Sequence, residues 1–397
     1  MTAINRNEYR ARQVAFADAL RKAGLRGAVV FSRGGATLDR FADVFYLSNF
    51  YQVYSYLPET PGLFSGRAHC ALVITAAGES TLCLSVAECE PKDLVANDIR
   101  HSSDFAGTVS GALRDADLGN GAVGLVGSDV LPLFLDRKIR LNLPDIDWRD
   151  CDELIHAIRR IKSPAEQVLV RRAARVHAEA LYKIAPSLRQ GMTEADLFAP
   201  FFAEMTRAGA GVYFAAMSSG PKISKWCSKG LPGFSTRRIE AGDMVRFDTG
   251  IVMDGYLSDF GHTTVCGPAN PDQRRLIDTV QEAVDITLTA IRPGRTVAEV
   301  VAAGESGLAD LGVTQMDNGP GTIHSSFPVH WGHGLGMGWE RPIMAASETT
   351  VIVPGMYLAI ERTLTMTGTG TAAAEQTLLV TDTGADVISA GPLGRWR

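Results

Sequence analysis

A short stretch, Arg246–Asp259, constrains the fold more strongly than any other part of the sequence. It contains two apolar segments that meet at Asp254-Gly255, and an Asp-Gly pair in such a setting favours a two-residue β-hairpin turn. This turn fixes the register of the two strands. The opposite residues would then be 253 and 256, 250 and 259, and 248 and 261.

Asp248 and Asp259 are the chemically informative residues of this predicted hairpin. Side chains alternate between the two faces of a strand, so the register puts both carboxylates on one face, in diagonal positions. Two carboxylates placed in this way repel each other unless a positive charge lies between them. One or two divalent cations would supply that charge. Two solvated aspartates on the exposed face of a hairpin would fit the pattern equally well.

The composition is that of a soluble globular enzyme. The chain has 397 residues, of which 46% are apolar and 21% are charged, and its net charge is −5. This balance gives no basic surface for nucleic acid. No apolar run is long enough to cross a bilayer. The length predicts two or three domains.

Cysteine usage and the first residues favour a cytoplasmic location. The six cysteines are scattered without a Cys-x-x-Cys pair, which fits free thiols in a reducing compartment. Residues 1–8 contain no apolar segment of the kind found in secretory signals. We therefore expect a cytoplasmic protein that binds neither nucleic acid nor membranes.

The first part of the chain mixes helical and strand patterns. Residues 8–25 have a helical pattern, and residues 45–57 are rich in aromatic side chains. The aromatic run predicts a core strand followed by a packed loop, with a binding surface as the alternative. This mixture predicts a compact α/β domain. The other expected strands are 27–31, 70–75, 80–86 and 122–126.

A second domain is predicted to follow, and it contains an internal repeat. Ser163-Pro164 has the form of an N-cap followed by proline at the first helical position, which predicts a helix over 164–186. Leu188–Leu197 then recurs as Ile291–Val300, each time after a long amphipathic helix. Self-similarity at this distance predicts two related halves, each built from a helix pair and antiparallel strands.

Glycine and threonine occupy matching positions within the repeated segments. Gly191 and Gly294 are expected to be C-caps of the preceding helices. Thr193 and Thr296 are expected to be N-caps of the following ones. Glu299, three residues after Thr296, completes the pattern of a capping box.

Further candidates for chemistry lie downstream of the predicted hairpin. His330 and His333 are three residues apart in a glycine-rich segment, where a ligand can approach the backbone closely. Glu361 ends an apolar strand and Glu375 begins another, and a carboxylate in such a setting is costly unless it is paired or coordinates a metal. Arg362 is the candidate ion-pair partner of Glu361.

The order, local context and spacing of five residues resemble the metal ligands of the pita-bread family, which includes methionine aminopeptidase, aminopeptidase P, prolidase and creatinase. These residues are Asp248, Asp259, His333, Glu361 and Glu375. Residues 1–157 are similar to the N-terminal domain of creatinase and prolidase, and residues 158–397 to the duplicated catalytic domain. The resemblance implies an α/β N-terminal domain followed by an α+β pita-bread catalytic domain with an internal two-fold repeat.

The resemblance also implies a metal-dependent hydrolase. Two divalent ions, with manganese, iron, cobalt and zinc all suited to the ligand set, would activate a water molecule to attack a C–N bond in a small amide or a dipeptide. Glu361 would handle the proton of that water. The family further implies a homodimer in which the N-terminal domain of one chain leans over the partner's site, a role that residues 45–57 would suit.

Two histidines of the peptidase members have no counterpart in this chain. Ser219–Cys227 resembles the segment in which the peptidases carry the first, and Trp226 or Cys227 falls near its place. Where the peptidases carry a His-Glu pair beyond the ligand histidine, this chain has Trp339 and Glu340. Xaa-Pro dipeptidase activity proper is therefore an alternative rather than the main expectation.

Four residues near the ligand set are candidates for binding the substrate. Trp226, Trp331 and Trp339 would wall the pocket, and three indoles suit a flat or cationic molecule. Core packing is the alternative for each of them. Arg341 would hold a substrate carboxylate, or else be solvated or paired.

Two further residues are candidates for catalysis beside Glu361. His330 would bind a substrate oxygen, or else support His333 from behind. Glu340 would act as a base.

Two other classes of function fit part of the pattern. Ser219–Cys227 and the spacing around Glu340 resemble the dimethylsulfoniopropionate lyases of this fold, in which a base removes an α-proton. The lyase base falls at Trp339 here, however, and a further lyase aspartate falls at Gly250. A non-catalytic binding module is the second alternative, and the complete ligand set disfavours it. Creatinase lacks this metal set, so the ligands also argue against its mechanism.

Overall fold

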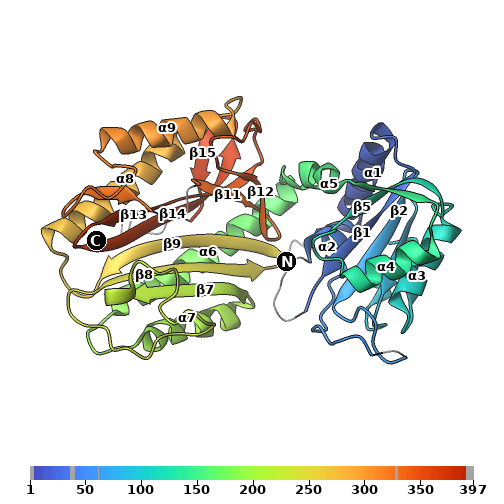
Figure 1. The fold of residues 1–397 in the computed structure, drawn as a ribbon, viewed down its shortest axis with the longest axis horizontal. Helices are drawn as coiled ribbons and strands as arrows, with labels where there is room; N and C mark the ends of the chain where they lie inside the picture. Colours follow the sequence, from blue (N-terminus) through green and yellow to red (C-terminus); the bar gives the residue numbers. More distant parts are fainter. Residues whose placement is uncertain (1–3, 36–40, 61, 327–329, 390–397) are drawn as a thin grey trace. The chain divides into compact units, whose positions relative to one another are not determined.

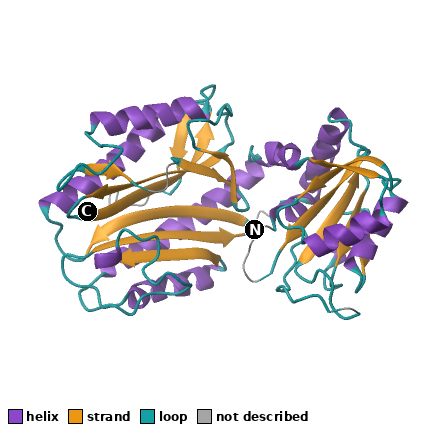
Figure 2. Cartoon of the chain, in the orientation of Figure 1, coloured by secondary structure: helices purple, strands orange, loops and turns teal. Residues whose placement is uncertain are grey.

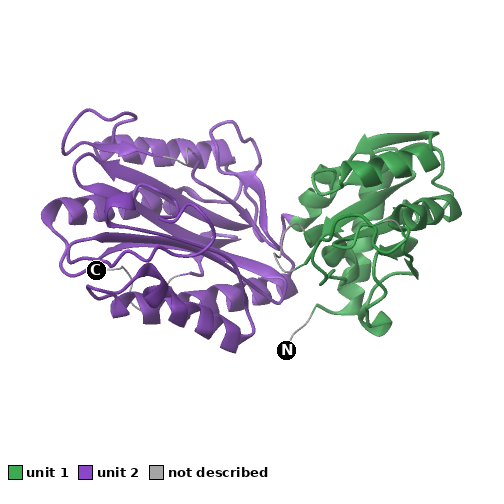
Figure 3. Cartoon of the chain, turned by 60° about the horizontal axis from the view of Figure 1, so that its bottom comes forward, with its two compact units in different colours: residues 1–159 green, residues 160–397 purple. Residues whose placement is uncertain are grey.

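The computed structural model describes residues 4–35, 41–60, 62–326 and 330–389. It divides into two compact units, residues 1–159 and residues 160–397 (Figure 3). The domain boundary predicted between residues 157 and 158 stays a prediction. No helix among the described residues combines the length and the hydrophobicity that a membrane span requires.

Unit 1 is an α/β unit around a six-stranded mixed sheet with the order β4-β3-β2-β1-β5-β6 (Figures 1 and 2). The central strand β1 has every residue but the last buried, because helices cover both faces of the sheet. The strands are β1 Gly27–Arg33, β2 His69–Thr75, β3 Ser80–Leu84, β4 Asp98–His101, β5 Gly121–Val126 and β6 Ile146–Asp150. The helices are α1 Arg6–Lys22, α2 Ala42–Ser48, α3 Phe105–Asp115, α4 Leu133–Asn142 and α5 Asp152–Arg159, with the 3₁₀ turn η1 Pro91–Asp93.

The strand predicted within residues 45–57 is wrong. The structure has the helix α2 there, and its buried residues Val44, Leu47 and Ser48 follow helical spacing. Asn49 ends the helix in the left-handed conformation, with φ of 59°. Asparagine tolerates that conformation better than most residues do, and the chain that follows it is irregular.

Unit 2 is an α+β unit around a nine-stranded sheet with the main order β12-β11-β13-β14-β9-β8-β7, to which β10 and β15 add at β13 and β14. The strands are β7 Gly211–Ser219, β8 Met244–Met253, β9 Tyr256–Val265, β10 Ile323–Ser325, β11 Gly332–Leu335, β12 Trp339–Ile343, β13 Tyr357–Met366, β14 Gly370–Thr381 and β15 Gly384–Val387. The helices are α6 Pro164–Ile184, α7 Glu194–Ala208, α8 Pro271–Ala290 and α9 Val297–Asp310, with the 3₁₀ turns η2 Ala185–Ser187 and η3 Gly220–Lys222.

The predicted hairpin is confirmed with its register. In β8 and β9, residue 253 pairs with 256, 250 with 259, and 248 with 261. Asp254 and Gly255 form the turn with φ of 53° and 87°. Positive φ at both positions is what a type I′ turn requires, and it matches the twist of the strands.

The internal repeat is also present in the structure. Thr193 and Thr296 are N-caps of α7 and α9, and each is part of a capping box. The Gly191 N–H donates to Ile239 O at 2.8 Å, and the Gly294 N–H donates to Ile352 O at 2.9 Å. The two segments therefore make the same contacts in the two halves.

The prediction that Gly191 and Gly294 are C-caps is wrong. The preceding helical segments end earlier, at Ser187 for η2 and at Ala290 for α8. Both glycines lie in the following turn, where φ is 88° and 90° and glycine is favoured.

The two halves meet in the middle of the sheet of unit 2. The hairpins β8–β9 and β13–β14 join where Ala374 pairs with His262. Helices α6 and α7 pack on the first hairpin and its neighbour β7, and α8 packs on the second (Figure 1). Each half places a carboxylate at the fifth position of its first hairpin strand, Asp248 in β8 and Glu361 in β13.

Candidate metal centre

Strand alternation places the predicted metal ligands on the face of the sheet that points away from the helices. In β8, the Phe247 ring packs against Phe198 of α7, and the Thr249 hydroxyl contacts His177 of α6. Asp248, between them, must point the other way. The same holds for Glu361, because its neighbour Ile360 belongs to the core beneath α8.

The register brings the carboxylates together around a glycine. Asp248 is opposite Gly261, and Glu361 is opposite Glu375. The antiparallel pairing of Ala374 with His262 puts Glu375 beside Gly261. A Cβ atom at Gly261 would lie 2.8 Å from the Phe247 carbonyl oxygen, so only glycine fits there. The centre of the cluster is thus free of a side chain.

Asp259 and His333 complete the cluster. Ligand atoms of Asp259, His333 and Glu375 all lie within 4.8 Å of one another. His333 Nε2 is 3.8 Å from Asp259 Oδ2 and 4.0 Å from Glu361 Oε1. His333 Nδ1 lies 3.1 Å from Gly334 O, and a hydrogen bond there holds the ring with Nε2 toward the carboxylates.

The carboxylates are not stabilised as anions by their protein surroundings. Burial, followed by the charge of Asp248, raises the pKa of Glu361 to about 8. Burial also raises the pKa of Asp248, and it raises those of Asp259 and Glu375 well above their ordinary values. Burial lowers the pKa of His333 to about 4, so its imidazole is neutral and able to bind a metal.

These residues fit one or more divalent cations. Asp259 Oδ1 is buried and has no hydrogen-bond donor among the described residues. A buried carboxylate oxygen without a donor is costly unless a cation takes that place. Carboxylate oxygens with one imidazole nitrogen are ligands that manganese, iron, cobalt and zinc accept.

Four aromatic side chains border the cluster on the side of β7. The Phe214 ring lies 5.8 Å from Trp226 and 5.2 Å from Trp339, and the Tyr213 ring lies 5.5 Å from Trp339. We call these four residues the aromatic wall. Trp226 and Trp339 are 54% and 47% exposed, which leaves ring surface open to a ligand.

Both tryptophans of the aromatic wall also bond to the predicted metal ligands. Trp226 Nε1 donates to Asp248 Oδ2 at 2.8 Å, and Trp339 Nε1 donates to Asp259 Oδ2 at 2.6 Å. Each bond favours the charged form of its aspartate, although burial outweighs it. The indoles therefore orient the two aspartates.

Gly250 makes room for the aromatic wall. It is opposite both Phe214 and Asp259, and a Cβ atom there would lie 2.4 Å from the Phe214 ring. An aspartate at position 250, as in the lyase pattern, is incompatible with this ring position.

Trp331 does not line the site, in contrast to the prediction. It has 0% exposure and lies in the core beneath α8 and α9. Its Nε1 donates to Glu305 Oε1 at 2.7 Å, and the Arg362 guanidinium lies 4.8 Å from its ring centre. Arg362 points to this core face and bonds to Ser325, so it does not form the ion pair suggested for Glu361.

His330 lies beside Glu361, as a catalytic role requires. Its Nδ1 is 3.6 Å from Glu361 Oε1 and accepts a hydrogen bond from the Gly332 N–H at 3.1 Å. Arg341, in contrast, is exposed, and its positive charge helps to lower the pKa of Glu348. No contact connects Arg341 with a predicted ligand among the residues that the structure describes.

The Glu340 carboxylate is held by contacts within the fold, so it is not a free base. Its Oε2 accepts a hydrogen bond from Lys162 Nζ at 3.0 Å, and its Oε1 accepts one from the Met337 N–H at 3.0 Å. Both side chains of the ion pair are nearly buried, with 2% exposure for Lys162 and 10% for Glu340.

Replacing Glu340 with glutamine is therefore expected to affect stability more than chemistry. Loss of one partner of a buried pair should lower the free energy of unfolding by about 3 kcal/mol. The value of kcat should stay within about threefold of wild type, far from the loss of about 100-fold or more expected for a base, because both oxygens of Glu340 are engaged by Lys162 and Met337. Urea unfolding and steady-state kinetics measure the two effects. A kcat loss of about 100-fold or more with unchanged stability, as expected for a base, would restore the catalytic assignment.

Arg246 lies on the face of the predicted metal ligands, and the sequence reasoning did not single it out. It lies two residues before Asp248 on the same strand and hence on the same face. The alternation that placed Asp248 and Asp259 on this face would have found Arg246 as well. The aromatic wall residues Tyr213 and Phe214 had no such signal, because β7 was not predicted.

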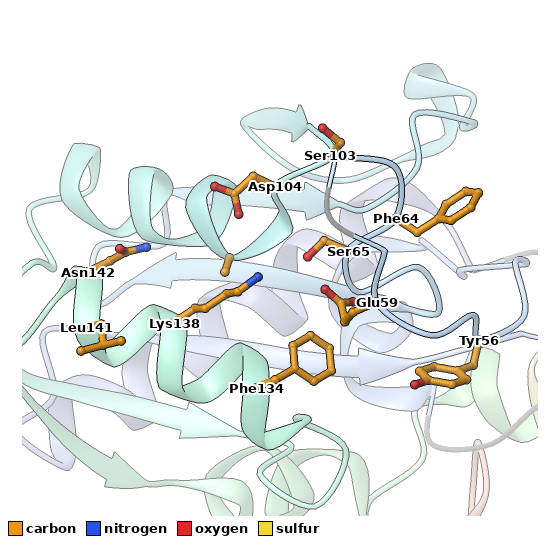
Figure 4. Close-up of a pocket in the computed structure, with 12 residues that line it drawn as sticks. Tyr56, Glu59, Phe64, Ser65, Ser103, Asp104, Phe134, Lys138, Leu141 and Asn142 are labelled. Carbon is orange, nitrogen blue, oxygen red and sulfur yellow. The ribbon is translucent and has the colours of Figure 1, made fainter.

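Unit 1 contains a separate cavity of about 760 Å³ between the irregular segment around Glu59 and helices α3 and α4 (Figure 4). It holds none of the predicted site residues. Its carboxylates have local partners: Glu59 accepts a bond from the Gly66 N–H, and Asp104 caps α3 at the Gly107 N–H. The chemistry of the five predicted ligands is thus confined to unit 2.

Family models match both parts of the chain. Residues 168–382 match the model of metallopeptidase family M24, and residues 12–161 match the creatinase/prolidase N-terminal domain. The segment that matches metallopeptidase family M24 contains all five predicted ligands.

Curated relatives and solved structures agree with these matches. The chain is 30% identical to a putative dipeptidase, YkvY, of Bacillus subtilis over 67% of this chain and 70% of that protein. It is 28% identical to the Xaa-Pro dipeptidase of Pyrococcus furiosus, over 60% of this chain and 66% of that one, just under two thirds of the relative's length. The structure of dipeptidase PepE from Mycobacterium ulcerans superposes with a TM-score of 0.78 at 25% identity, over 98% of both chains. Prolidase from Pyrococcus furiosus gives a TM-score of 0.74 at 21% identity, over 94% of this chain and 99% of that one, and shows the fold alone.

Proposed function

The chain belongs to metallopeptidase family M24 and is a metal-dependent hydrolase, and on this premise we propose that it cleaves a C–N bond of an amide or peptide in a small substrate. The reaction takes place at the cluster of Asp248, Asp259, His333, Glu361 and Glu375. The observation that carries this proposal is a cluster of four carboxylates around the open position at Gly261. Two of them, Asp259 and Glu375, are buried, and Asp259 Oδ1 is unpaired among the described residues. We infer that the cluster holds two divalent ions.

The bound ions would supply a water of lowered pKa and would polarise the carbonyl group of the substrate. Glu361 accepts the proton of the attacking water and returns it to the leaving nitrogen, a task for which a buried carboxylate of raised pKa is suited. Asp248 and Asp259 are held in place by Trp226 and Trp339 during this cycle.

His330 is proposed to act beside Glu361 as a neutral donor. Burial and the Arg362 charge lower its pKa, so the ring is uncharged near neutral pH. Because Nδ1 accepts the bond from the Gly332 N–H, the proton of the neutral ring lies on Nε2. That N–H is available to a substrate oxygen.

Trp226 and Trp339 are proposed to bind the apolar part of the substrate through the aromatic wall. Their indole groups then have two roles, a ring face for the substrate and an N–H for an aspartate. Phenylalanine separates the roles, because it keeps the ring and removes the N–H.

In the Trp339→Phe variant, the dissociation constant of Mn²⁺ is expected to rise by about tenfold, the usual effect of removing a group that orients a ligand. KM should change little. In Trp339→Ala, which also loses the ring contact with Phe214, KM should rise as well. Calorimetric titration with Mn²⁺ and steady-state kinetics measure these effects. Unchanged metal affinity in the first variant together with unchanged KM in the second would contradict both roles.

Hydrolysis is favoured over elimination by the same surroundings. The lyase mechanism needs a strong base in the pocket, and Glu340 is engaged by Lys162 and Met337. Trp339 occupies the place of the lyase base, and the Phe214 ring fills the space over Gly250.

The experiment that tests the proposal is turnover in H₂¹⁸O by protein loaded with Mn²⁺. The substrates would be dipeptides, including Xaa-Pro dipeptides because the relatives are dipeptidases, and N-acylated amino acids. We expect metal-dependent cleavage that places ¹⁸O in the newly formed carboxylate. An unsaturated product without ¹⁸O would show a lyase, and absence of cleavage across these amides would remove the hydrolase proposal for small C–N substrates. The homodimer and the cytoplasmic location predicted from the sequence stay predictions.

A further inference from the structure

Arg246 is a buried cation on the same face of the sheet as the predicted metal ligands. It pairs with Thr263 of β9 on one side and with Ser218 of β7 on the other. These three paired residues form one row across the sheet. The next row on the same face holds Asp248, Glu375 and Glu361. A ligand that reaches the cluster therefore also comes close to Arg246.

Among the described residues, the guanidinium of Arg246 has a single hydrogen-bond acceptor, the Lys225 carbonyl oxygen. The residue is 6% exposed, and its Nη2 donates to the Lys225 carbonyl oxygen at 2.5 Å. No carboxylate lies within ion-pair distance of it among the described residues, and the negative charges that act on it from further away are those of Asp248 and Glu361. Its Nε and Nη1 atoms are not among the enclosed unpaired atoms, so they reach accessible space. A buried guanidinium without an ion-pair partner is costly, and structures keep one when it has a task.

The other arginines near the site differ from Arg246. Arg362 lies on the core face, where it contacts Glu305 at 3.5 Å and the ring of Trp331. Arg341 is exposed near Glu348. Only Arg246, among these three, combines the site face, burial and open donors.

The charges of the site define what Arg246 can bind. With two divalent ions bound, the four carboxylates would act as metal ligands, so Asp248 and Glu361 would no longer serve as counter-ions of Arg246. In a site of low dielectric constant, an uncompensated guanidinium favours an anion, and its planar fork of N–H groups matches a carboxylate. We propose that Arg246 is a specificity-determining residue that binds a free carboxylate of the substrate beside the bond that is cleaved.

This inference rests on the proposed hydrolase activity and restricts its substrates to small amides that carry a free carboxylate. It also transfers the carboxylate-binding role predicted for Arg341 to Arg246. Arginine presents a bidentate fork and lysine a point charge, so Arg246→Lys should retain only part of the binding.

The test compares an N-acylated amino acid with its uncharged amide as ligands of the Mn²⁺-loaded protein. The probes are N-acetylglycine and N-acetylglycinamide, and calorimetry measures binding independently of turnover. In Arg246→Gln, the dissociation constant of N-acetylglycine should rise on the order of 30-fold, as for the loss of a charge-assisted bond, and that of the amide should change little. Arg207→Gln, on the exposed surface of α7 with 72% exposure, is the matched control.

The outcomes separate this inference from the proposed function. If wild type binds and cleaves both classes equally well, or if Arg341→Gln causes the selective loss, the role of Arg246 is wrong while the hydrolase stands. If Arg246→Gln instead loses Mn²⁺ and weakens both probes alike, Arg246 supports the metal site rather than the substrate. If wild type cleaves neither class but still binds N-acetylglycine through Arg246, the hydrolase proposal fails and the anion site stands.

Discussion

Replacing Asp259 with asparagine is expected to lower kcat/KM by a factor on the order of 1000, which corresponds to about 4 kcal/mol of transition-state stabilisation supplied by a bound metal. Asp259 is 2% exposed, and its ligand oxygen lies within 4.8 Å of those of His333 and Glu375. Asparagine keeps the shape and the bond from Trp339 but removes the charge that would hold a cation. The measurement is steady-state kinetics at saturating Mn²⁺.

The melting temperature is a second property that the Asp259→Asn substitution should change. Mn²⁺ should raise the melting temperature of wild type through mass action on the folded state, and it should not raise that of Asp259→Asn. The metal-free variant should be at least as stable as metal-free wild type, because one of four mutually repelling carboxylates is gone. The matched control is Asp254→Asn in the turn of the same hairpin, where the carboxylate pairs with Arg172 on the surface. An Asp259→Asn variant that keeps both its activity and its response to Mn²⁺ would contradict the site.

The carboxylates of the cluster are expected to lower the stability of the metal-free protein as the pH rises from 6.5 to 8. Burial raises the pKa values of Asp248, Asp259, Glu361 and Glu375 in the folded state, with Glu361 at about 8. Between its unfolded and its folded pKa, such a group binds a proton only when folded. The free energy of unfolding therefore falls with pH, by about 1.4 kcal/mol per pH unit for each group.

Buried histidines oppose this trend up to about pH 7.5, one unit above their ordinary pKa. Burial lowers the pKa values of His69, His177, His262 and His333 to between about 3 and about 4. In that range the unfolded chain binds the extra protons, so these histidines make the protein more stable as the pH rises toward 6.5. At pH 6.5 the unfolded histidines are still about half protonated, so each of the four adds about 0.4 kcal/mol of stability between pH 6.5 and 8. The effect of the carboxylates is therefore measured against a variant in which the histidines are unchanged.

Urea unfolding at pH 6.5 and 8.0, with chelator and with Mn²⁺, measures this effect. Over this interval the metal-free wild type should lose about 1.6 kcal/mol relative to metal-free Glu361→Gln, since a carboxylate with a folded pKa of about 8 contributes that much. With Mn²⁺ the two proteins should change alike, because cations replace the protons on the carboxylates. Equal changes of metal-free wild type and Glu361→Gln between the two pH values would show that Glu361 is not protonated in the way that burial requires.

The parts of the fold that local rules determine were predictable from the sequence. The Asp254-Gly255 turn alone gave the register of β8 and β9, because a two-residue turn leaves one alignment of its strands. Thr193 and Thr296 predicted the starts of two helices through capping chemistry. The family, the α/β and α+β pita-bread fold and the class of metal-dependent hydrolase, which the resemblance implied, are likewise confirmed by the matches to the two family models.

The parts that depend on distant contacts were not predictable. The partner of Glu340 is Lys162, which lies 178 residues away in the sequence and reaches it only through the folded sheet. Trp331 is near His333 along the chain, yet strand β11 begins at Gly332 and the indole points into the core. Nearness in sequence to a ligand does not give the direction of a side chain. Strand alternation does, and it places Arg246 on the same face of the sheet as Asp248.

The most direct test of the account is the metal content of the wild-type chain, measured by mass spectrometry after purification without chelator and again after reconstitution with Mn²⁺. The four carboxylates and His333 predict two divalent ions per chain. A folded protein that binds no metal in either preparation would contradict the proposed site and, with it, hydrolysis by this cluster.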